Sequence, residues 1–151
     1  MKHSLSAIFC VFFIFHSLAS SNSSAENDGN DNPPTGNKMR IKVGTKTFVA
    51  TLYDNATATA FKSLLPMTVI VVELNGNEKY FDLPDNLPTN ASNPRTIQAG
   101  DLMIYGSNTL VLFYKTFATS YSYTKLGRIN DTEGFAVTVG SENVTVTYER
   151  E

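Results

Sequence analysis

The chain has 151 residues, with 12 Lys and Arg against 14 Asp and Glu, so its formal net charge is −2. Because charges of both signs are interspersed and form no basic stripe, we expect no nucleic-acid partner. The single cysteine and both histidines lie close to the N-terminus, at Cys10, His3 and His16. The chemistry open to the rest of the chain therefore depends on how the N-terminus is processed.

Residues 1–25 have the pattern of a secretory signal peptide. Lys2 precedes an apolar run from Ala7 to Leu18, and small residues that offer cleavage sites follow it. The run is too short to span a bilayer stably, so we expect a secreted or periplasmic protein with no membrane span after cleavage. An uncleaved anchor is the alternative.

Cleavage would remove every histidine and cysteine of the chain. Disulfides, zinc sites built on these residues, and Ser-His-Asp or Cys-His catalysis would then be excluded. We accordingly predict no metal site and no cofactor. Residues 26–37 are rich in Asn, Asp, Gly and Pro, which is typical of a flexible linker. Residues 38–151 are predicted to form one domain, long enough to bury a core without disulfides.

Alternating and β-branched runs predict strands within this domain. In chain order they are 39–43, 46–53, 67–74, 78–83, 101–105, 109–115, 121–129, 135–139 and 143–149. Asn75-Gly76 predicts a hairpin, three prolines place 84–99 in an irregular loop, and a turn is expected at 130–134. The run 67–74 is predicted to be buried on both faces. The fold class is mainly β, a closed antiparallel barrel of about eight strands, with a two-sheet sandwich as the alternative.

One short helix is predicted over residues 56–65, because Ala58, Phe61 and Leu64 fall on one helical face. Asn55 is placed to cap its first turn, and Pro66 to end it. We therefore interpret Asn55 as a capping residue and not as part of an active site. Replacement of Asn55 by Asp is expected to be tolerated, since a carboxylate caps a helix equally well.

Short motifs in a fixed order resemble those of small bacterial cyclophilin-like domains. They are Leu52 to Asn55 before the helix, Leu64 to Pro66 after it, Glu78 to Tyr80, Gly100 to Leu102, and Phe113-Tyr114. The helix sequence Thr57-Ala58-x-x-Phe61 and the run 125–129 are also similar to cyclophilins. The resemblance covers nearly all of 39–149 and implies a cyclophilin-like β-barrel with the helix plugging one end.

The catalytic motifs of the cyclophilin proline isomerases do not carry over. Those enzymes have an arginine in a Phe-His-Arg run after the first helix, followed by Gln-Gly-Gly-Asp, whereas residues 67–76 here read MTVIVVELNG. Arg40, Arg95 and Arg128 lie outside that motif, so no catalytic residue is assigned. The leading hypothesis is a non-catalytic module for a peptide or small-molecule ligand. A peptidyl-prolyl isomerase with a displaced arginine is the alternative, and a purely structural domain is a third.

Aromatic residues are concentrated between positions 105 and 123. They are Tyr105, Phe113, Tyr114, Phe117, Tyr121 and Tyr123. They fill either the barrel interior and a packed outer face, or a shallow aromatic groove for a ligand. The candidate ligand-binding residues are Tyr105, Phe113, Tyr114 and Tyr121, with Tyr105 and Tyr121 at the rim. An arginine pointing into such a groove would favour the isomerase, and a groove without one would favour binding.

Overall fold

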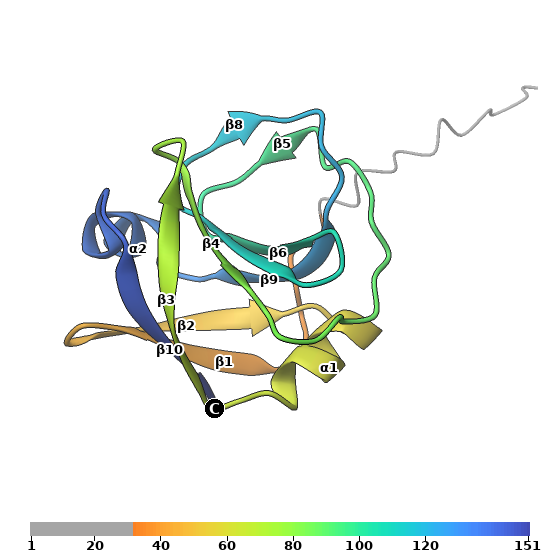
Figure 1. The fold of residues 1–151 in the computed structure, drawn as a ribbon, viewed down its shortest axis with the longest axis horizontal. Helices are drawn as coiled ribbons and strands as arrows, with labels where there is room; N and C mark the ends of the chain where they lie inside the picture. The colour runs from red at the N-terminus through yellow and green to blue at the C-terminus, as the bar shows by residue number, and fades with distance from the viewer. Residues whose placement is uncertain (1–31) are drawn as a thin grey trace, which may run out of the picture.

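The structure is a computed structural model that describes residues 32–151; the expected signal peptide and residues 26–31 lie outside this part of the chain. The barrel strands are β1 (Lys38–Val43), β2 (Lys46–Leu52), β3 (Met67–Leu74), β4 (Glu78–Asp82), β6 (Asp101–Tyr105), β7 (Thr109–Phe113), β9 (Thr124–Ile129) and β10 (Val144–Arg150). They close in the order β1-β10-β3-β4-β7-β6-β9-β2, and every pair is antiparallel (Figure 1). The predicted closed antiparallel barrel is confirmed.

A separate two-stranded sheet lies outside the barrel wall. Its strands, β5 (Thr96–Ile97) and β8 (Phe117–Ala118), come from the proline-containing loop and from the segment after β7. Figure 1 shows this pair held away from β4 and β6. We call it the β5–β8 flap.

The hairpin predicted at Asn75-Gly76 is confirmed. Leu74 pairs with Glu78 across the turn, and both central residues have positive φ angles, 57° for Asn75 and 68° for Gly76. Asn and Gly are the residues that adopt this conformation most readily, which is why the pair marks tight hairpins. The turn sets the register of β4 against β3.

Burial of β3 on both faces was predicted, and that prediction is wrong. Val71 is fully buried, but Ile70 is 60% exposed and Leu74 is 39% exposed. A barrel wall has one inner and one outer face, and within the described residues no second layer covers the outer face of β3. Its β-branched residues suit a pleated backbone even where that backbone faces solvent.

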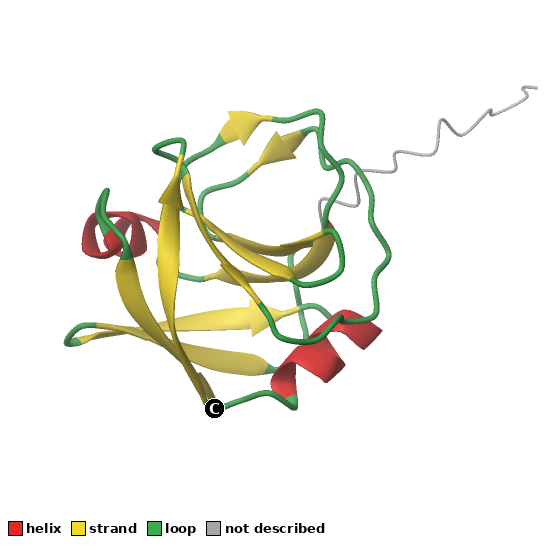
Figure 2. Cartoon of the chain, in the orientation of Figure 1, coloured by secondary structure: helices red, strands yellow, loops and turns green. Residues whose placement is uncertain are grey.

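The helix α1 (Ala56–Lys62) covers one end of the barrel (Figure 2). The Asn55 side chain caps it as predicted, since Oδ1 accepts a hydrogen bond of 2.8 Å from the Ala58 amide. The same side chain also donates from Nδ2 to the Lys125 carbonyl at 2.9 Å, which ties the helix to β9. In the barrel core, the Phe61 ring of α1 packs edge-on against the Tyr148 ring, with ring centroids 5.8 Å apart.

A second helix, α2 (Thr132–Val139), replaces the turn and strand predicted over 130–139. That prediction is wrong because Phe135 and Val139, which looked like alternate residues of a strand, are four apart and share a buried helical face, while Val137 is 80% exposed. Asp131 caps the helix by accepting a bond of 3.0 Å from the Gly134 amide. Figure 2 shows the two helices at opposite ends of the barrel.

The barrel interior is filled by side chains from the barrel strands and from both helices of residues 32–151. Its large fully buried residues include Met39, Ile41, Leu52, Phe61, Leu102, Ile104, Phe135 and Tyr148. Neither helix of residues 32–151 is long and apolar enough to cross a membrane.

Asn55 provides a test of how α1 is attached. Asn55→Ala should lower the free energy of unfolding by about 0.5–2 kcal/mol, because the cap is lost. Contrary to the sequence-based expectation, Asn55→Asp should also lower it, by about 1 kcal/mol, because a carboxylate cannot donate to the Lys125 carbonyl. Chemical denaturation measures both. Asp131→Asn is the matched control: Asp131 caps α2 through an oxygen alone, so this exchange should leave the free energy of unfolding nearly unchanged. An Asn55→Asp protein as stable as the unmodified one would contradict this account.

Candidate functional site

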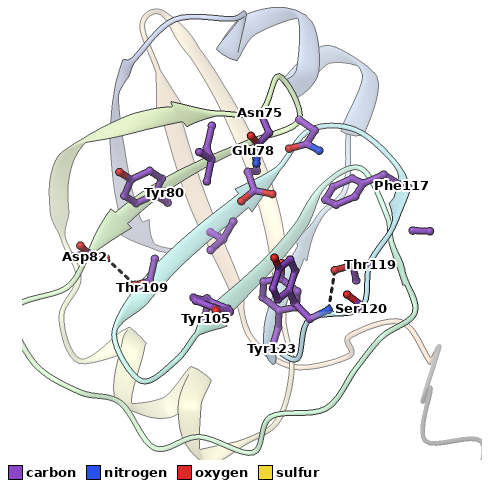
Figure 3. A pocket seen from close by; sticks show the side chains of 15 residues that line it. Asn75, Glu78, Tyr80, Asp82, Tyr105, Thr109, Phe117, Thr119, Ser120 and Tyr123 are labelled. Carbon is purple, nitrogen blue, oxygen red and sulfur yellow. Dashed lines mark hydrogen bonds between the residues drawn. The ribbon is translucent and has the colours of Figure 1, made fainter.

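The outer face of β4, β6 and β7 forms the floor of an aromatic groove of about 500 Å³ (Figure 3). The β8 strand of the flap and residues 119–123 form its opposite side. Its aromatic lining residues are Tyr80, Tyr105, Phe117, Tyr121 and Tyr123, and its acidic ones are Glu78 and Asp82. We refer to this feature as the aromatic groove.

Strand alternation determines which side chains reach the groove. On β4, Glu78, Tyr80 and Asp82 project outward, whereas Lys79 and Phe81 project into the barrel. Thr109 and Val111 on the neighbouring β7 also line the groove, and Leu110 between them is part of the barrel core. The groove therefore rests on a wall whose other face is packed against the core, which gives it a rigid floor.

The aromatic rings around the groove contact one another in a chain. Tyr105 lies 6.2 Å from Tyr121 and 5.7 Å from Tyr123 between ring centroids. Phe113 lies 5.5 Å from Tyr123 and 5.7 Å from Phe117. Such edge-to-face and tilted contacts each contribute about 0.5–1.5 kcal/mol beyond burial, so the rings hold one another in place.

Three of the four sequence-predicted site residues gather at this groove. Tyr105 and Tyr121 line it and are 47% and 62% exposed, respectively. Phe113 is fully buried beneath Tyr123 and Phe117, so it supports the groove from below. Tyr114 is not brought together with them, because it belongs to the barrel core on the opposite face of the wall.

Tyr114 instead joins a polar network at the α2 end of the barrel. Its hydroxyl donates to Glu73 at 2.6 Å, and the fully buried Lys79 ammonium donates to the same carboxylate and to the Glu142 carbonyl, each at 2.6 Å. Burial and the bond to Glu73 raise the pKa of Tyr114 to about 12. Burial also acts to raise the pKa of Glu73, but the hydrogen bonds from Lys79 and Tyr114 and the lysine charge outweigh it and lower that pKa.

Glu78 is a site residue that the sequence reasoning missed. Its carboxylate is half-buried in the groove and makes no ion pair or side-chain hydrogen bond with any residue of 32–151. Burial raises the pKa of Glu78, and the negative charge of Glu73 raises it further. Asp82, at the other end of β4, accepts a hydrogen bond of 2.7 Å from the Thr109 hydroxyl.

A second hollow, of about 610 Å³, lies between α1 and residues 88–92. Its walls are mainly Thr, Asn and Ser side chains, and its Asn55 is already engaged by the α1 cap and by Lys125. It has no comparable aromatic wall, since Tyr53 is its one ring among the described residues. No group of three or more acidic, histidine or cysteine side chains that could hold a metal ion occurs within residues 32–151.

The model of the Cyclophilin-like family matches residues 41–149. This chain belongs to that family. The match begins within β1 and ends within β10, so it covers the closed barrel and both helices. A comparison with curated proteins finds no match.

Two solved structures share the fold. The structure of McbB in complex with tryptophan is 13% identical, with a TM-score of 0.59, and the match covers 75% of this chain but only 44% of McbB. The solution structure of the hypothetical protein AF2241 from Archaeoglobus fulgidus is 17% identical, with a TM-score of 0.53, and the match covers 80% of this chain and 98% of that one. At these identities the likeness shows the fold alone.

The Tyr114 network gives a prediction with a defined pH dependence. In Tyr114→Phe, Glu73 loses a donor, so the free energy of unfolding near neutral pH should fall by about 1–2 kcal/mol. An unfolded tyrosine titrates near pH 10, below the folded pKa of about 12, so this contribution is complete below pH 10 and is lost as the pH rises towards 12. Denaturation curves of both proteins from pH 8 to 12 should therefore converge.

The control for this experiment is Tyr105→Phe, which removes an exposed hydroxyl and should leave the curves unchanged. A difference between Tyr114→Phe and the unmodified protein that stays constant across the alkaline range would show that the hydroxyl does not act through Glu73.

Proposed function

We propose that this cyclophilin-like domain is a binding module, and that the aromatic groove takes up a peptide or a small molecule. The observation that carries the proposal is a groove of about 500 Å³ whose aromatic walls remain open to solvent on a rigid floor. Ligand sites are typically about 300–1,000 Å³, mostly apolar, with a few polar groups that orient the ligand. The Glu78 and Asp82 carboxylates and the tyrosine hydroxyls are the polar groups here.

The distribution of arginine supports binding over proline isomerisation. No arginine is among the groove-lining residues of the described chain. Arg128 pairs with Asp101 at 2.9 Å, and the Arg40 guanidinium lies 3.8 Å from Glu149. Arg95, which directly precedes β5, does not line the groove either. The isomerase alternative therefore has no arginine side chain in the groove to support it.

The McbB structure is described as a complex with tryptophan, so a protein containing this fold can bind a small aromatic molecule. This chain spans less than half of McbB, and the tryptophan belongs to that protein. The likeness supports ligand binding as a general class for this domain and does not identify its ligand.

We also propose that the domain acts outside the cytoplasm, on the strength of the signal-peptide pattern in residues 1–25. The absence of cysteine and histidine from residue 26 onward is compatible with an oxidising compartment. N-terminal sequencing of protein recovered from the medium or the periplasm should find a start near residue 20 or 26. An intact Met1 would overturn the proposal.

Binding is tested by NMR titration of the protein with a library of amino acids and short peptides. A ligand should shift the amides of β4, β7 and residues 117–123. Tyr105→Ala should weaken ligand binding by about two- to tenfold, because a stacking contact contributes about 0.5–1.5 kcal/mol. It should also lower the melting temperature by a few degrees, because the ring contacts with Tyr121 and Tyr123 are lost, so the titration is run well below that transition.

The matched control is Tyr53→Ala, which removes a tyrosine from the hollow beside α1 and should not affect affinity. Amide shifts confined to that hollow would contradict the assignment of the site. Turnover of a prolyl peptide in an isomerase assay on the same protein would favour the enzyme.

A further inference from the structure

The charged side chains of the aromatic groove are all acidic. Glu78 and Asp82 line it, and no Lys or Arg of residues 32–151 does. The tyrosine rings add to this field, because the faces of aromatic rings carry partial negative charge and attract cations. The groove would therefore repel an acidic ligand and favour a basic one.

Glu78 lacks the cation partner that three other acids of the barrel wall, Glu73, Asp101 and Glu149, have. The ion pairs of the wall join Glu73 to Lys79, Asp101 to Arg128 and Glu149 to Lys42, at 2.6, 2.9 and 3.1 Å. A half-buried carboxylate without a partner is partly desolvated and gains no compensating attraction. A cation brought by a ligand would supply that attraction at Glu78.

The spacing of the two carboxylates points to an elongated ligand. Figure 3 shows Glu78 and Asp82 separated along β4 by Tyr80. Both project from the same face of the strand, four residues apart, and a strand rises about 3.3 Å per residue, so their Cα atoms lie about 13 Å apart. One small cation can reach only one of them, whereas an extended peptide has the same residue spacing and can reach both.

We propose that the groove binds an extended basic peptide, in which one Lys or Arg side chain pairs with Glu78 and another, four residues along, reaches Asp82. This inference rests on the proposed binding function. The residues between the two basic ones pack against Tyr80 and Tyr105. The chain's own residues 21–31 do not fit, because they carry Glu26, Asp28 and Asp31 and no basic residue.

The test compares three peptides that differ only in charge: acetyl-Lys-Ala-Phe-Ala-Lys-amide and its analogues with Gln or Glu in place of both Lys residues. Fluorescence or calorimetric titration of the protein should rank Lys above Gln by about tenfold and find the Glu peptide weakest. Raising the salt concentration should weaken the Lys peptide selectively, because exposed charge attraction is screened.

Variants assign the preference to named side chains. Glu78→Gln should reduce the affinity for the Lys peptide to nearly that of the Gln peptide and leave the Gln peptide unaffected; Asp82→Asn should give a smaller loss. Glu133→Gln, at an exposed acid on α2, is the matched control.

The two proposals fail in different ways. Equal binding of all three peptides, with amide shifts in the groove, would overturn the charge preference and keep the binding function. Preference for the Glu peptide would also overturn it. No groove shift with any peptide or any library member would overturn the binding function itself.

Discussion

Eight strands closed into a barrel enclose a space that side chains alone can fill, and in this domain Phe61 from α1, Tyr148 from β10 and Phe135 from α2 complete the filling. The helices are needed because a closed wall still has two open ends, and each helix buries one face over one of them. An interior filled in this way leaves no room for a ligand. Whatever this domain recognises must meet its outer surface, and the aromatic groove on β4, β6 and β7 is where that surface is hollowed and lined with rings.

Much of the fold can be predicted from the sequence because its signals are local. The Asn75-Gly76 hairpin and the Asn55 cap each depend on residues within one turn of the chain, and both are confirmed. The failures occur where local pattern is ambiguous. The segment Phe135 to Val139 reads equally as a short strand or as one face of a helix, and its packing against Phe48, which is distant in sequence, decides between them.

The groove could be predicted only in part, for a related reason. A concentration of aromatic residues is visible in the sequence, and Tyr105 and Tyr121 do lie in one groove. The side of the wall on which each residue falls depends on register, and Tyr114 follows Phe113 directly, so the two must face opposite ways once β7 is in place. No local sequence pattern marks Glu78 as a site residue, because its position beside the aromatic rings depends on the pairing of β4 with β7.

The pairing of β1 with β10 has a consequence for how the molecule is made. Arg40 and Arg150, which are hydrogen-bonded, are 110 residues apart along the chain, and β3 also takes β10 as its neighbour. Both strands that flank the closing seam must therefore wait, with open backbone edges, until the last strand has left the ribosome. Closure thus depends on one strand, β10, and until it pairs the other seven strands can form only an open sheet with β1 and β3 at its two edges.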